Sequence, residues 1–81
     1  MAIVVSKKLD CLGQLEPLPF LALRKALMSI PEGHVVEIIW DDPSGPMDIP
    51  AWCRATGHEL LEIYDQGDSL SYYIQKKFTL D

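Results

Sequence analysis

Short stretches rich in β-branched and aromatic residues recur along this chain and are typical of β-strands. They cover residues 3–9, 35–40, 59–64 and 69–76. The second stretch is apolar almost throughout, which predicts a strand that is central in a sheet or buried on both faces. Residues 65–68 (Asp-Gln-Gly-Asp) separate the last two stretches and predict a hairpin loop.

Two other stretches have the apolar spacing of amphipathic helices. From Pro19, which suits a first helical turn, apolar residues recur at helical intervals to about Ser29. A second, short helix is expected between an N-cap at Asp48 and a stop at Gly57. The residues expected in the core are Phe20, Leu23, Leu27, Val36 and Ile38.

The resulting order, β-α-β-α-β-β, limits the architecture. Two helices cannot cover both faces of a small four-stranded sheet, so we expect an α/β (α+β) two-layer sandwich with both helices on one face of a mixed sheet. The right-handed crossover rule makes the first two strands a parallel pair if they are neighbours. With 81 residues the chain has room for one hydrophobic core, so residues 1–81 are expected to form a single domain.

Composition and charge argue against several functions. The net charge of -5 repels phosphate, so nucleic acid is not an expected partner. Every apolar stretch falls short of the roughly 20 residues that span a bilayer, so no membrane partner is expected. Lys7 and Lys8 interrupt the apolar residues near the N-terminus, so no signal peptide is expected and the cytoplasm is the expected location. The sequence has no metal-ligand spacing, and we expect no cofactor.

The segment between the first strand and the first helix, residues 10–19, is the most distinctive part of the sequence. Gly13 permits unusual backbone angles, and two prolines disfavour a helix before Pro19. With this segment the chain resembles the TusA/SirA-like sulfurtransferases, also called UPF0033, whose mark is Asp-x-x-Gly-x-x-Cys-Pro-x-Pro before a helix. The matching positions are Asp10, Gly13, Pro17 and Pro19, and Glu16 stands where that family carries its cysteine.

The resemblance implies the β-α-β-α-β-β fold and a protein partner of a sulfur-transfer pathway, with Arg24 and Lys25 as candidate partner-binding residues. In that family the cysteine accepts persulfide sulfur from one protein and passes it on. A helix N-terminus favours the thiolate that this chemistry needs. Glu16 keeps a negative charge but cannot form or hold a persulfide. We therefore interpret the chain as a non-catalytic binding or regulatory homologue.

Several alternatives stay open. Glu16 is either a functional acid that binds a cation or mimics the thiolate, or a favourable charge near a helix start, and we favour the second interpretation. Cys11 is either a displaced sulfur acceptor or a small buried residue, and Cys53 is the less plausible acceptor. Free cysteines are usually buried, so we favour packing for both. A small-molecule or nucleic-acid binding module on the same fold would rest on analogy alone.

Acid–base catalysis has little support in the sequence. A second carboxylate for Glu16 would have to come from Asp10, Asp41 or Asp42, and nothing in the sequence positions these residues across a cleft. His58 and Glu59 are consecutive, so their side chains are expected on opposite faces of a strand.

Overall fold

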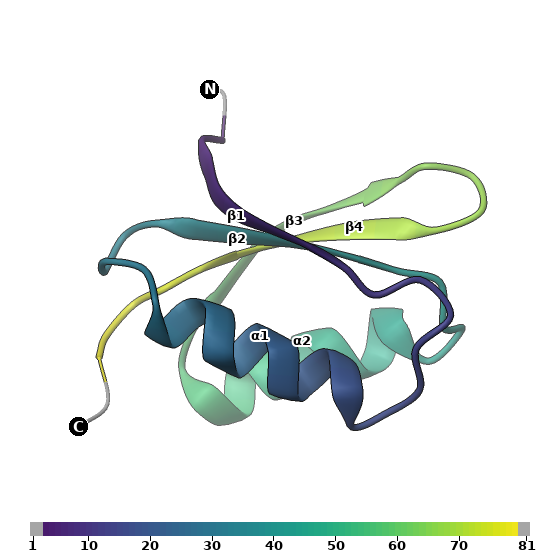
Figure 1. The fold of residues 1–81 in the computed structure, drawn as a ribbon, viewed down its shortest axis with the longest axis horizontal. Helices are drawn as coiled ribbons and strands as arrows, with labels where there is room; N and C mark the ends of the chain where they lie inside the picture. Colours follow the sequence, from purple (N-terminus) through teal and green to yellow (C-terminus); the bar gives the residue numbers. More distant parts are fainter. Residues whose placement is uncertain (1–2, 80–81) are drawn as a thin grey trace.

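The computed structural model describes residues 3–79, and its elements follow the predicted order (Figure 1). The strands are β1 (Val5–Asp10), β2 (Val35–Trp40), β3 (Glu59–Asp65) and β4 (Leu70–Gln75). The helices are α1 (Leu18–Met28) and α2 (Gly45–Thr56). Both helices lie against the same face of the sheet, which confirms the two-layer sandwich.

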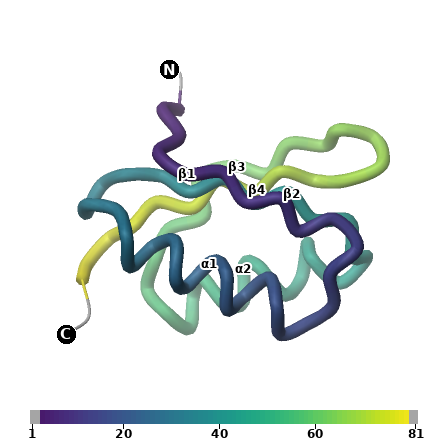
Figure 2. Tube along the Cα trace, viewed as in Figure 1, coloured from purple at the N-terminus to yellow at the C-terminus, as the bar shows by residue number. Residues whose placement is uncertain are grey.

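The four strands form one mixed sheet in the order β1-β2-β4-β3. β1 and β2 are parallel, as the crossover rule predicts, and the other two pairs are antiparallel. β2 is central and buried along nearly its whole length, which explains its continuous apolar character. Because β1 and β2 are parallel, their C-terminal ends lie side by side at one end of the sheet. The chain leaves both strands toward the helices there (Figure 2).

The hydrophobic core lies between the sheet and the two helices. Of the residues predicted for it, Leu23, Leu27, Val36 and Ile38 are buried. Phe20 is half-buried and packs edge-on against Trp40, with 5.8 Å between ring centroids. The helical spacing in α1 and the nearly continuous apolar character of β2 therefore identified residues that pack in the core.

Two N-terminal boundaries differ from the prediction. β1 begins at Val5 and not at Ile3, because its pairing with β2 starts at Val5 and Val35, where β2 itself begins. α1 begins at Leu18, one residue earlier than expected, with Pro19 in its first turn. A proline is tolerated there because the N–H that it lacks has no partner inside the helix.

The predicted start of α2 is wrong. The cap is Ser44, and Asp48 lies within the first turn. The Ser44 carbonyl accepts from the backbone N–H groups of Met47 and Asp48 at 3.1 and 2.9 Å. Asp42 holds this turn, because its Oδ1 accepts from the backbone N and Oγ of Ser44 at 2.8 and 2.7 Å. With twelve residues α2 is not a short helix, yet within residues 3–79 neither helix is long and apolar enough to cross a membrane.

Candidate functional site

The motif loop, residues 11–17, joins the end of β1 to the start of α1. Its first residue, Cys11, continues the parallel pairing, because its backbone N–H donates to the Ile39 carbonyl at 2.8 Å. Asp10 Oδ1 then accepts from the backbone N–H of Leu12 at 3.1 Å. The strand pairing therefore ends at Cys11, and the turn held by Asp10 leads the chain out of the sheet from there.

Two residues at the end of β2 hold the middle of the motif loop. The backbone N–H of Gly13 donates to Asp41 Oδ1 at 3.0 Å, and Trp40 Nε1 donates to the carbonyl of Gln14 at 2.9 Å. Gly13 has a φ of 75°, a conformation that glycine adopts without strain. These two hydrogen bonds attach the loop to the end of β2. The positive φ explains why a glycine occupies this position of the motif.

Glu16 lies at the end of the motif loop, where the chain turns into α1. The backbone N–H of Leu18 donates to the Leu15 carbonyl at 3.0 Å, and Pro17, which follows a cis peptide bond, occupies the N-cap position. The Glu16 side chain is exposed. The carboxylate at the start of α1 is therefore accessible from solution.

Carboxylates from the start of α2 lie close to Glu16. Hydrogen bonding with Asp48 raises the pKa of Glu16, and partial desolvation and the negative charges of Asp48 and Asp42 raise it further. A helix N-terminus acting alone would lower this pKa. The nearby carboxylates therefore oppose the favourable effect of the helix N-terminus on a charge at Glu16. Within residues 3–79, no group of three or more acidic, histidine or cysteine side chains is arranged to hold a metal ion.

Replacing Glu16 with glutamine is expected to raise the thermal midpoint at neutral pH. The folded protein raises this pKa, so it binds the proton more tightly than the unfolded chain, and the ionised carboxylate opposes folding above the pKa. The advantage of Glu16→Gln should therefore disappear as the pH falls to about 4, where the native carboxyl becomes neutral. Thermal melts at both pH values measure this, with the exposed Glu32→Gln as a control. If Glu16→Gln raised the thermal midpoint by the same amount at both pH values, the expected repulsion between the carboxylates would be contradicted.

Both cysteines lie in the core. Cys11 and Cys53 are only 2% and 4% exposed, and both are free thiols. Burial raises the pKa of Cys11, and the charge of Asp10 raises it further. Burial raises the pKa of Cys53 to about 11, against the opposing charge of Arg54. Both groups therefore stay protonated and covered, whereas sulfur transfer needs an accessible thiolate.

Exposed leucines flank Glu16 along the chain. Leu15, Leu18 and Leu21 are 70%, 55% and 58% exposed. Leu18 and Leu21 are three residues apart and therefore neighbours on the surface of α1. Leu18 and Leu21 fall outside the helical spacing that identifies the buried face of α1, and this is the signal in the sequence for their exposure. The start of α1 therefore exposes three apolar side chains close in sequence to the charged side chain of Glu16.

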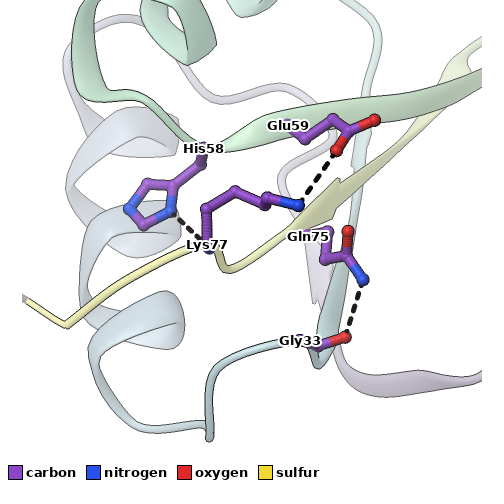
Figure 3. A network of polar contacts seen from close by, with 5 residues as sticks. All are labelled: Gly33, His58, Glu59, Gln75 and Lys77. Carbon is purple, nitrogen blue, oxygen red and sulfur yellow. Dashed lines mark hydrogen bonds and ion pairs between the residues drawn. The ribbon is translucent and has the colours of Figure 1, made fainter.

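The other candidate residues are divided between two regions. Arg24 and Lys25 are exposed further along α1. His58 and Glu59 lie at the opposite edge of the sheet from the motif loop and both contact Lys77 (Figure 3). His58 Nδ1 accepts from the backbone N–H of Lys77 at 3.3 Å, and Glu59 Oε1 lies 3.3 Å from its Nζ. The structure therefore does not bring His58 or Glu59 to Glu16.

Several known proteins resemble this chain over most of its length. The sequence model of the family described as Sulfurtransferase TusA matches residues 7–76. YrkI of Bacillus subtilis, provisionally named a sulfur carrier protein, is 37% identical over 70 residues, which cover 86% of this chain and 93% of YrkI. The sulfur carrier protein TusA of Pseudomonas syringae is 33% identical over 75 residues, 93% of this chain and 89% of its own. The crystal structure of a SirA-like protein from Desulfitobacterium hafniense has the same fold, with a TM-score of 0.75 at 23% identity over 89% of this chain and 99% of that one.

Proposed function

Because this chain belongs to the TusA sulfurtransferase family, we propose that it is a non-catalytic member, which binds a protein partner of sulfur transfer without accepting the sulfur. One observation carries the proposal: the accessible side chain at the helix start is the carboxylate of Glu16, whereas Cys11 and Cys53 are both buried. A carboxylate has no sulfur with which to form the S–S bond of a persulfide.

The surface around Glu16 supports the binding half of this proposal. We define the docking patch as Leu15, Glu16, Leu18 and Leu21. Its three leucines are more than half exposed, and protein interfaces commonly combine an apolar centre with polar groups at the rim. A carboxylate at the helix start presents the negative charge that a thiolate would present there. The expected partner is therefore a protein that receives the thiolate of cysteine-bearing relatives, with Arg24 and Lys25 as further polar contacts.

The rival function, sulfur transfer through Cys11, would require the motif loop to open. Its thiol is covered, and its backbone N–H is bonded to Ile39 in the sheet. Exposing the thiol would also expose part of the core that surrounds it. Transfer through Cys53 would likewise require part of α2 to move, because Cys53 is buried on the inner side of that helix.

The native chain is expected to slow the loading of a cysteine-bearing relative while gaining no sulfur itself. The test incubates both proteins with a cysteine desulfurase and cysteine, and intact-mass analysis follows each of them. Leu18→Asp should abolish the inhibition by placing a charge in the docking patch, whereas Val4→Asp, at a site 80% exposed outside the patch, should retain it. Absence of inhibition by the native chain would reject the proposed binding. A one-sulfur mass gain on the native chain that vanishes in Cys11→Ser would establish the rival function.

A further inference from the structure

A cavity of about 210 Å³ lies at the end of α1 away from the motif loop. Residues from the last turns of α1, the C-terminal half of α2 and the segment after β4 line it. On α1 its lining begins at Arg24, so the cavity lies toward the end of the helix, whereas the docking patch lies toward its start. Its apolar lining includes Leu27, Met28, Trp52 and Phe78.

Stacked rings form one wall of this cavity. Trp52 and His58 have ring centroids 6.2 Å apart with 24° between their planes. His58 and Phe78 are closer, with 4.8 Å between centroids and 11° between planes. The two stacking contacts fix the orientation of all three side chains, so an apolar ligand would meet a preformed surface.

Lys76 is the buried cationic residue of the lining. Its side chain is 4% exposed, and its Nζ donates to the Ile30 carbonyl at 2.7 Å. Within residues 3–79 the only ion pair joins Lys77 to Glu59, so no described carboxylate neutralises Lys76. An ammonium group has three N–H donors, and burying it without a counter-charge is unfavourable. An anion in the cavity would satisfy this charge.

His58 supplies a second polar group. Burial and the nearby charge of Lys76 lower the pKa of His58, so its ring is neutral at neutral pH. Its Nδ1 accepts from the backbone N–H of Lys77, which leaves the ring proton on Nε2 as a donor (Figure 3). Arg24, exposed on α1, adds a positive charge to the lining. The polar groups of Lys76, His58 and Arg24 are therefore donors.

We propose that this cavity binds a small monocarboxylate with an apolar body. The carboxylate is received by the Lys76 ammonium and the His58 ring N–H, and the apolar body packs against Leu27, Trp52 and Phe78. The site uses no residue of the motif loop or of the docking patch, and Arg24 is the one residue that it shares with the proposed partner contacts. The charge of Lys76 selects for an anion, and the volume of the cavity limits the ligand to a small molecule.

Three ligands with the same alkyl chain test the proposal: octanoate, octanol and octylamine. Each is titrated into the full chain and followed by NMR, with the Trp52 indole and the Phe78 amide as reporters. Octanoate is expected to bind roughly tenfold more tightly than octanol, because only its carboxylate is charged and hydrogen-bonds to Lys76 and His58. Octylamine, which is positively charged, should bind more weakly than either. Lys76→Met should remove the advantage of octanoate over octanol, whereas the exposed Lys77→Met should retain it.

Met28→Glu is a second test of carboxylate binding that leaves the Lys76 hydrogen bond intact. It replaces the test by Lys76→Met if that variant does not fold. Met28 is 62% exposed and lines the cavity, so the substitution adds a negative charge without disturbing the core. It should weaken octanoate binding several-fold and leave octanol binding unchanged. Equal affinities of the native chain for octanoate and octanol, no binding of octanoate, or shifts confined to the motif loop would each overturn the proposal.

Discussion

Leu23→Ala is expected to lower the free energy of unfolding by about 2–5 kcal/mol, because it removes a completely buried side chain from the centre of α1 and leaves a cavity. A loss of this size is a large part of the roughly 5–15 kcal/mol that stabilises a typical domain. Urea denaturation followed by circular dichroism measures the change in midpoint and slope.

Leu21→Ala is the matched control for this experiment. Leu21 lies two residues away on the same helix, but it is 58% exposed, so the same truncation leaves no cavity. Its effect is expected to stay within about 0.5 kcal/mol. Equal losses in the two variants would mean that the buried face of α1 has been misassigned.

The fold could be predicted because its main determinants are local. The apolar run of β2 indicates a central strand, and the spacing of Leu23 and Leu27 indicates which side of α1 is buried. The start of α2 was missed because a Ser-Gly-Pro sequence has the composition of a turn, while Asp42 makes it the first turn of a helix; the predicted stop at Gly57 is confirmed. That outcome depends on a side chain whose direction the pattern of apolar residues does not specify.

The neighbours of Glu16 depend on tertiary structure. The motif loop follows β1, and Asp42 and Asp48 follow β2, so only the parallel pairing of these strands brings the three carboxylates together. The crossover rule predicted that these strands are parallel if they are neighbours, and their common C-terminal end was the signal from which the proximity could have been inferred. The Lys76 cavity had no comparable signal, because the segment after β4 that lines it has no regular pattern.

Glu16→Cys is expected to change the protein from one that gains no sulfur to one that gains a single sulfur atom from a persulfide donor. The new thiolate would attack the outer sulfur of the donor persulfide. One S–S bond forms on this chain, the donor's S–S bond breaks, and the donor keeps its thiolate. The start of α1 and the attached motif loop would hold the cysteine where the carboxylate now lies. Intact-mass analysis after exposure to a cysteine desulfurase and cysteine measures the gain.

Two further variants separate the effect of position from that of simple exposure. Leu12→Cys places a thiol at a site 49% exposed in the same loop but away from the helix start, and it should load far less. Adding Asp48→Asn to Glu16→Cys should speed loading, because a neighbouring carboxylate disfavours the thiolate just as it disfavours ionised Glu16. If Glu16→Cys folds but gains no sulfur while a cysteine-bearing relative gains sulfur in the same experiment, a thiol at this position is not sufficient for sulfur transfer. Equal loading of Leu12→Cys and Glu16→Cys would show that the position at the helix start has no special role.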